Sequence, residues 1–260
     1  MINPKSDRNF AKAVAQRNKS DKIDAKVLSQ AIVIAKESEI VIPLVNPIVE
    51  GIKELISYYK LKVKLRVQLN NHLESLKAKD TNKTLIASLK KDIDKIKKEE
   101  DNIIENIYNI IIKDKELKAK YESIISIDGI GKVAAIVLLH LFIKYPNANQ
   151  RQIVSLTGLD PIIKESGSSI RGKTRISKAG GKIYRATLFM PVMVAIRHNN
   201  QMKEFYNRLK GNGKHTTVAQ VAVMRKLIII AHSLYKSGEF YDKERYLLNA
   251  GIQKDKCLAS

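Results

Sequence analysis

Residues 86–117 read IASLKKDIDKIKKEEDNIIENIYNIIIKDKEL. Steps of three and four residues separate the aliphatic positions, and only two polar residues interrupt the series. Its members are Ile86, Leu89, Ile93, Ile96, Glu100, Ile103, Ile107, Ile110, Asp114 and Leu117. Such a repeat places aliphatic side chains along one seam of a helix. The stretch therefore predicts a long helix in a coiled coil.

A looser form of the same repeat precedes it, with breaks at Lys62 and Arg66. Its members are Ile48, Ile52, Leu55, Tyr59, Leu69, Leu73 and Leu76. The polar turn 79–83 separates the two repeats, and Asp80 or Thr81 is the expected cap of the second helix. We therefore predict an antiparallel helical hairpin with arms of about 45–50 Å. Dimerisation, nucleic-acid binding and plain structural support are all compatible with such a hairpin.

The rest of the chain divides around the hairpin, which we assign to residues 47–120. Residues 1–46 are polar, with a short helix signal and an extended segment over 39–45. Residues 121–260 hold eleven of the twelve glycines. Apolar periodicity there predicts helices over 186–196, 202–209 and 218–235. The expected fold is mainly α.

Composition indicates a polyanionic partner. The formal net charge is +21 and the pI is near 9.8, an excess typical of nucleic-acid-binding proteins. The plainer alternative is a lysine-rich surface, and the segment 60–64, KLKVK, resembles solvated helix surface. Cys257, the single cysteine, excludes a disulfide framework and a cysteine metal site.

The N-terminus and the apolar runs predict a cytoplasmic protein. The first ten residues, MINPKSDRNF, contain no apolar signal core. Long apolar runs such as Ala134–Phe142 fall short of the roughly 20 residues that a membrane span needs. We therefore expect neither secretion nor membrane insertion.

Residues 158–185 read GLDPIIKESGSSIRGKTRISKAGGKIYR and combine a serine with a dense positive charge. Seven basic residues and one acid lie between Lys164 and Arg185. A hydroxyl nucleophile at Ser166, surrounded by phosphate-binding side chains, suits phosphoryl transfer on DNA. The cations expected to stabilise the reacting phosphate are Arg171, Arg175, Lys178 and Arg185, with Lys164 as a further phosphate contact.

Two alternatives accompany this interpretation of the segment. Ser168, Ser169 and Ser177 compete with Ser166 for the role of nucleophile. Nonspecific phosphate contact without catalysis would require the same composition.

Residues 127–132, IDGIGK, precede the apolar run. Two glycines around one aliphatic residue, followed by a helix, are typical of helix-hairpin-helix modules, whose backbone N–H groups meet a DNA phosphate. The predicted contacts are Gly129, Gly131 and Lys132. An ordinary glycine turn between packed helices is the alternative.

Asp21 and Asp24 are spaced i, i+3, so a helix would place both carboxylates on one face. Together they could hold a divalent cation. The alternative is that acids in a first helical turn only stabilise the helix dipole. Two carboxylates are also too few for a two-metal nuclease site.

Taken together, the motifs resemble a bacterial insertion-sequence transposase family. Members pair a RuvC-like DEDD nuclease domain with a serine-bearing C-terminal domain. The similar segments are Asn3-Pro4, 19–25 (KSDKIDA), 127–131, 158–161, Ser166-Gly167, 176–180, Arg185 and Lys226-Leu227.

The resemblance implies a DNA recombinase that is guided by a structured RNA and works as a homo-oligomer. It also implies Mg²⁺ bound by four acids, with Ser166 as the nucleophile and Asp21 and Asp24 as the last two acids.

The chain departs from this pattern at its start. The family's first Asp and its Glu lie upstream on strands of the nuclease sheet, whereas 20 residues precede Asp21. We therefore expect residues 1–46 to be the remnant of an α/β RNase H-like domain in a truncated transposase. The alternatives are a noncatalytic nucleic-acid-binding protein and an inactive transposase remnant. A structural coiled-coil protein would leave residues 158–185 unexplained.

Overall fold

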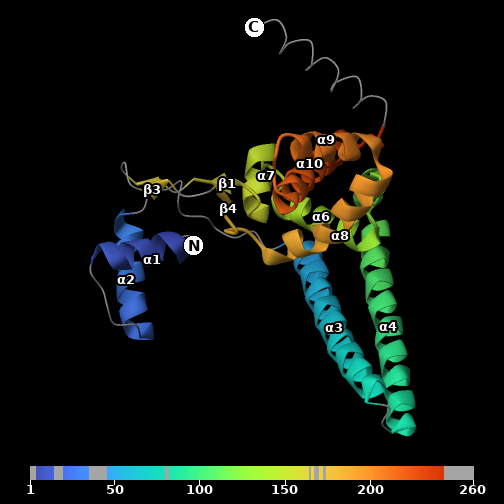
Figure 1. The fold of residues 1–260 in the computed structure, drawn as a ribbon. Coiled ribbons are helices and arrows are strands. Elements are labelled where there is room, and N and C mark those ends of the chain that lie inside the picture. Colours follow the sequence, from blue (N-terminus) through green and yellow to red (C-terminus); the bar gives the residue numbers. More distant parts are fainter. Residues whose placement is uncertain are drawn as a thin grey trace, which may run out of the picture. The chain divides into compact units, whose positions relative to one another are not determined.

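The structure is a computed structural model that describes residues 4–14, 20–34, 46–79, 82–163, 165–166, 170–171 and 174–242. Contacts divide the chain into two compact units, residues 1–46 and 47–260 (Figure 1). Each unit is described by itself. The described elements are helices and four strands of two residues each, so the mainly α fold expected from the sequence is confirmed.

The first unit consists of α1 (Pro4–Ala13) and α2 (Asp21–Ile34), which pack against each other. Helix α2 buries Val27 and Ala31, whereas Val33 is 83% exposed. The described part of this unit contains no strand, and the segment 39–45 lies outside the described residues. The RNase H-like remnant therefore stays a prediction.

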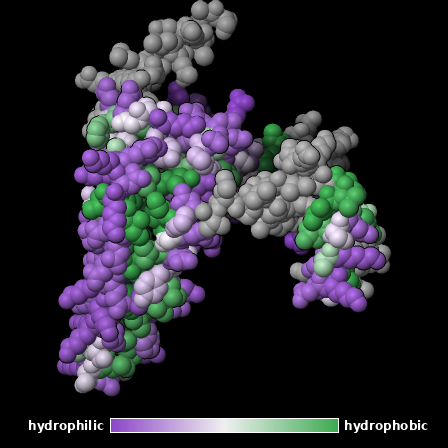
Figure 2. Space-filling model, turned by 180° about the vertical axis from the view of Figure 1, so that it is seen from behind, coloured by the Kyte–Doolittle hydropathy of each residue, from purple (hydrophilic) through white to green (hydrophobic). Residues whose placement is uncertain are grey.

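Two long helices, α3 (Pro47–Ala78) and α4 (Lys83–Ile112), form the hairpin of the second unit (Figure 1). Near its tip, Leu73 packs with Leu89 and Ile93. Closer to the other helices, Ile103 and Ile107 are buried in the main core. Figure 2 shows the resulting hydrophobic band along the hairpin, bordered by hydrophilic side chains. The antiparallel hairpin follows the predicted repeats, while supercoiling of the pair stays a prediction.

Arg66 and Lys62, the polar residues that break the first repeat, pair with acids of α4 across the hairpin. Arg66 Nε donates to Glu100 Oε1 at 2.7 Å, and Lys62 Nζ lies 2.6 Å from Glu99 Oε2. The hydrogen bond to Glu100 raises the pKa of Arg66. Because Glu100 is buried, its partner on α3 compensates for the removal of its charge from water. The breaks are thus matched polar contacts between α3 and α4.

Asp114, the second polar position of the α4 repeat, marks a helix boundary. Its side chain accepts hydrogen bonds from the backbone N–H groups of Glu116 and Leu117, which caps α5 (Lys115–Ile125). One continuous arm to Leu117 is therefore wrong, because a capping aspartate favours a new start over helix continuation. At the hairpin tip, Asn82 caps α4 through the N–H of Leu85, in place of the expected Asp80 or Thr81.

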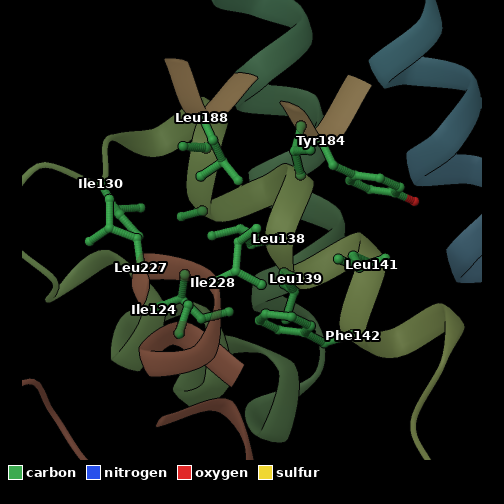
Figure 3. Packing of buried hydrophobic residues seen from close by; sticks show 14 of the residues in the cluster. Ile124, Ile130, Leu138, Leu139, Leu141, Phe142, Tyr184, Leu188, Leu227 and Ile228 are labelled. Atoms are coloured by element: carbon green, nitrogen blue, oxygen red, sulfur yellow. The ribbon is translucent and has the colours of Figure 1, made fainter. Parts of the chain in front are cut away.

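Helix α6 (Lys132–Lys144) occupies the centre of the second unit. Each residue from Ala134 to Phe142 is buried, and α6 contacts α3, α4, α5, α8 and α10. Figure 3 shows Leu138, Leu139 and Phe142 in this core. Residues on both sides of position 120 belong to the same hydrophobic cluster. The hairpin and the C-terminal helices are therefore held together by one core.

Four further helices complete the described part of the second unit. They are α7 (Gln150–Thr157), α8 (Lys182–His198), α9 (Asn200–Gly211) and α10 (Thr216–Ser237). The helices expected from apolar periodicity over 186–196, 202–209 and 218–235 are confirmed, and each extends beyond its predicted ends.

Helix α10 is long and apolar enough to cross a membrane by length and composition, with a mean hydropathy of 1.4 in its most apolar window. Uninterrupted apolar runs in the sequence did not indicate this property of α10. Half of that window is buried inside the fold, and α10 packs against the five helices α5 to α9. Its apolar side chains therefore serve the core of the second unit.

Candidate functional site

A β arm, residues 161–176, connects α7 to α8. Strand β1 (Pro161–Ile162) pairs antiparallel with β4 (Arg175–Ile176), and β2 (Glu165–Ser166) pairs antiparallel with β3 (Ile170–Arg171). The β2–β3 pair lies in sequence between the two strands of the β1–β4 pair. Ile163, between β1 and β2, is 65% exposed. The described strands of the arm are joined by backbone pairing.

Hydrogen bonds fix the root of the arm to the end of α7. Gly158 caps α7 with a φ of 67°, a left-handed conformation that favours glycine. Its carbonyl accepts from the N–H of Lys178 at 3.0 Å, and the Ser177 hydroxyl donates to Asp160 Oδ1 at 2.5 Å. Ser177, one of the four candidate serines, therefore has a structural partner.

The predicted nucleophile Ser166 lies in β2, opposite Ile170 of β3. Arg171 lies opposite Glu165. The structure describes only the backbone at these four positions, and Lys164 lies outside the described residues, as do Ser168 and Ser169. The fold thus places Ser166 and Arg171 on neighbouring strands of one arm.

The remaining predicted cations of this segment differ in their surroundings. Arg175 and Lys178 are exposed near the root of the arm, and Lys178 has a φ of 54°. Arg185 is half-buried, and its Nη1 donates to the carbonyls of Thr157 at 2.7 Å and Gly180 at 3.0 Å. Arg185 thus joins the end of α7 to the start of α8, a structural use that its sequence position did not reveal.

The turn between α5 and α6 uses its two glycines differently. Gly129 has a φ of 97°, and a Cβ there would lie 2.9 Å from the backbone nitrogen of Ala195 in α8. Gly131 caps α6 without a side-chain hydrogen bond, and a Cβ there would meet nothing within 4 Å. Gly131 and Lys132 are exposed. This end of α6 is an open helix N-terminus, suited to an anion.

A groove of about 950 Å³ lies between α3, this turn and α8. Its lining is largely apolar and includes Val63, Val133 and Met190. Lys60, Lys64 and Lys132 also line it, and none of the three pairs with a carboxylate in the described parts of the chain. We name these three side chains the groove lysines.

Sequence reasoning missed the groove lysines of α3. It assigned the segment 60–64 to solvated helix surface, and that interpretation fits Lys62, which pairs with Glu99. Lys60 and Lys64 lie one helical turn apart, and both line the groove. Their i, i+4 spacing was the available signal, but the groove itself requires α8, more than a hundred residues away.

Acidic residues are sparse in the C-terminal part of the sequence. Residues 121–260 hold 22 of the 47 basic residues but 9 of the 26 acidic ones. On α10, Lys226 lies over the ring of Phe205 at 4.9 Å, and burial, followed by the nearby charge of Arg208, lowers its pKa. The scarcity of acidic residues gives residues 121–260 a net positive charge.

Asp21 and Asp24 lie in the first turn of α2, and both are exposed. Ser20 directly precedes this helix, and its hydroxyl accepts from the N–H of Ile23 at 3.3 Å. Within the described residues, no group of three or more acids, histidines or cysteines is placed to hold a metal ion. Two carboxylates are too few for the four-acid Mg²⁺ site implied by the resemblance, so Mg²⁺ binding stays a prediction.

The part of the chain that contains this site is similar to known proteins. Residues 121–207 match the transposase IS116/IS110/IS902 family. The match includes the α5–α6 turn, the β arm and α8.

Individual proteins are similar to this chain over more than residues 121–207. The chain is 28% identical over 253 residues to the pilin gene-inverting proteins of Moraxella bovis and Moraxella lacunata, which covers 94% of this chain and 74% of each relative. An uncharacterized 43.6 kDa protein of insertion element IS110 from Streptomyces coelicolor is 26% identical over 131 residues, or 49% of this chain and 31% of that protein.

Proposed function

We propose that this protein is a DNA recombinase of the transposase type that cleaves and rejoins DNA through Ser166. The observation that carries the proposal is the match of residues 121–207 to a transposase family, because this range contains the serine-bearing arm. The similarity to two pilin gene-inverting proteins along most of the chain supports DNA rearrangement as the activity.

The proposed reaction is a phosphoryl transfer. The Ser166 Oγ forms a bond to a DNA phosphorus while the bond from that phosphorus to one deoxyribose oxygen breaks. The serine proton leaves to solvent, and the released deoxyribose oxygen takes up a proton. Attack by a deoxyribose hydroxyl of another DNA end reverses these steps and frees the serine. Arg171 and Arg175 lie on the same arm and would stabilise the negative charge on the reacting phosphate.

The groove and the arm root would hold the DNA. The groove lysines, the open N-terminus of α6 and the exposed Arg175 and Lys178 supply positive charge. Contacts of this kind fix the position of a strand without specifying its sequence. A structured guide RNA, Mg²⁺ at Asp21, Asp24 and further acids, and a homo-oligomeric assembly remain parts of the proposal that rest on the resemblance alone.

A noncatalytic nucleic-acid-binding protein is the second candidate. The groove favours it, because the groove lysines lie on α3 and α6 and do not depend on a reactive serine. The two candidates share nucleic-acid binding and differ in covalent chemistry. Two experiments therefore test the proposal.

The first experiment measures binding of the purified chain to double-stranded DNA as a function of salt. If about six phosphates are contacted, affinity falls about a thousandfold between roughly 50 mM and 200 mM salt, because condensed counterions are released on binding. Absent binding, or binding that does not change with salt, contradicts both candidates.

The second experiment looks for a covalent protein–DNA adduct, with DNA that carries the sequences flanking the gene as substrate. Ser166→Ala is expected to abolish the adduct while DNA affinity stays nearly unchanged. Ser168→Ala and Ser169→Ala serve as matched controls and are expected to retain it. An adduct that survives Ser166→Ala but is lost in a control assigns the nucleophile to the other serine. No adduct with any form of the protein favours the noncatalytic candidate.

A further inference from the structure

A second cavity of about 370 Å³ lies at the start of α8, where α3, α6 and α7 meet the segment 179–181. Its volume falls in the range of small-ligand sites. Ile56, Val137 and Leu156 contribute apolar surface. The cavity shares Lys60 and Ile183 with the groove, so the two are neighbours along the same face of α3.

The charges around this cavity favour an anion. Lys53, Lys60 and Lys144 line it. Lys53 also pairs with Glu50 at 2.5 Å, whereas Lys60 and Lys144 have no carboxylate partner in the described parts of the chain. Gly181, another lining residue, caps the 17-residue α8 without a side-chain hydrogen bond. The N-terminus of that helix adds a partial positive charge at the same place.

A buried histidine, His140, lines the same cavity, and one of its two ring nitrogens lacks a partner in the described structure. His140 is 6% exposed, and its Nε2 has no hydrogen-bond partner in the described structure. Its Nδ1 lies 3.4 Å from the Tyr184 hydroxyl, and burial raises the pKa of Tyr184 to about 12, so the phenol keeps its proton. A phenol that donates to Nδ1 leaves the hydrogen of the neutral imidazole on Nε2.

The His140 ring lines the cavity, although its Nε2 is itself buried from solvent. Figure 3 shows Tyr184 with its hydroxyl pointing away from the core residues Leu138 and Leu188. Tyr184 itself lines the cavity, so its ring offers the ligand a flat surface as well as an orienting partner for His140.

We propose that this cavity binds a single nucleotide unit of a nucleic-acid strand. Its phosphate would lie among Lys60, Lys144 and the N-terminus of α8, and its base would rest on the apolar floor against the ring of His140. The apolar floor and the aromatic rings account for a base, which a bare phosphate would leave without contacts. The inference rests on the proposed function, because the nucleotide would belong to the DNA strand that the groove and the root of the β arm are proposed to hold.

Histidine ring signals of the full chain in NMR spectra provide the first test, with thymidine 5′-monophosphate as the probe. The nucleotide is expected to shift the signals of His140, which His140→Gln identifies. His232 is a matched internal control: it is 2% exposed, its Nδ1 is also unpartnered, and it packs on Phe142 at 5.1 Å. Signals of His140 that stay fixed, or move together with those of His232, overturn the proposal. Inorganic phosphate that binds as tightly as the nucleotide overturns the role of the base.

Lysine variants of the full chain provide the second test, with a short single-stranded oligodeoxynucleotide as the probe. Lys144 follows His140 by four residues on α6, and Lys236 follows His232 by four residues on α10, so Lys236→Gln is the matched control. Lys144→Gln is expected to remove the His140 shift, weaken oligonucleotide binding severalfold and lower the salt slope by about one. Equal effects of the two variants overturn the proposal.

The outcomes separate this inference from the proposed function. Salt-dependent oligonucleotide binding with fixed His140 signals contradicts the nucleotide cavity alone. If the unmodified chain binds no nucleic acid, the nucleotide cavity and the proposed function are both contradicted.

Discussion

Helix α3 carries positive charge in two different settings. On the side that faces α4, Lys62 pairs with Glu99 and Arg66 pairs with Glu100. On the side that faces α8, Lys60 and Lys64 line an apolar groove without a carboxylate partner in the described structure. The paired charges hold the hairpin together, whereas the unpaired ones are available to a ligand. The net charge of +21 therefore contains a structural part and a part that is free to bind.

Removal of the groove lysines tests this difference most strongly. The triple variant Lys60→Gln, Lys64→Gln and Lys132→Gln is expected to weaken DNA binding about a hundredfold and to lower the salt slope by about three, one unit for each lost phosphate contact. DNA titration at several salt concentrations measures both quantities.

A matched triple variant on α4 controls for net charge. Lys90, Lys91 and Lys98 are exposed on the hairpin, so their replacement by Gln removes the same charge away from the groove. DNA affinity is expected to change only a fewfold. Equal losses for the two triple variants would mean that binding follows net charge and not the groove.

Loss of one partner in the hairpin ion pair should destabilise the fold. Glu100→Ala leaves the half-buried Arg66 guanidinium without its acceptor and is expected to lower the free energy of unfolding by about 2 kcal/mol. The double variant Arg66→Leu, Glu100→Leu should recover most of this loss, because no unpaired charge remains. Chemical denaturation gives both values. A double variant less stable than Glu100→Ala would mean that the pair itself contributes net stability.

His140 should make the fold sensitive to mild acid. Burial, followed by the nearby charge of Lys144, lowers its pKa from 6.5 to about 4. Of the smaller influences, Glu50 raises this pKa and Lys53 lowers it. Between these two values the unfolded chain binds a proton that the folded chain does not, so stability falls as pH drops below 6.5. The expected contribution is about 2 kcal/mol between roughly pH 7 and pH 5.

Denaturation of His140→Phe at both pH values measures this contribution. The variant should lose part of the acid sensitivity, and the remainder includes His232, whose pKa burial also lowers. His72→Gln changes an exposed histidine and is expected to behave like the unmodified chain. An unchanged acid response in His140→Phe would mean that the folded protein accepts the proton on His140.

The helices could be predicted from the sequence because helix formation depends on neighbours three and four residues apart. The repeats from Ile48 to Leu117 indicated the hairpin, and the apolar run Ala134–Phe142 indicated a core helix. Helix ends were less certain. Asp114 continued the repeat in sequence, yet it caps a new helix, because one side chain can suit both roles.

The serine-bearing segment and its basic residues were also evident from local composition and from a family resemblance. Their uses were not. Arg185 was expected to contact phosphate, which stays a prediction, and in the fold its Nη1 also joins α7 to α8. Ser177 was one of four candidate serines, and its hydroxyl donates to Asp160. Hydrogen bonds of this kind join residues 17 and 28 positions apart, a separation that periodicity does not report.

The sequence by itself determined the mainly α fold, the hairpin and the placement of a serine within a basic segment, because each follows from residues close together in the chain. Only the tertiary structure decided which charges are free. Lys60 differs from Lys62 because the packing of α3 turns one toward α8 and the other toward Glu99. His140 lies in a continuous apolar run, and only the meeting of α3, α6 and α8 leaves its Nε2 buried beside a cavity. Both distinctions arise from contacts between residues far apart in sequence, where burial and pairing are set by the whole fold.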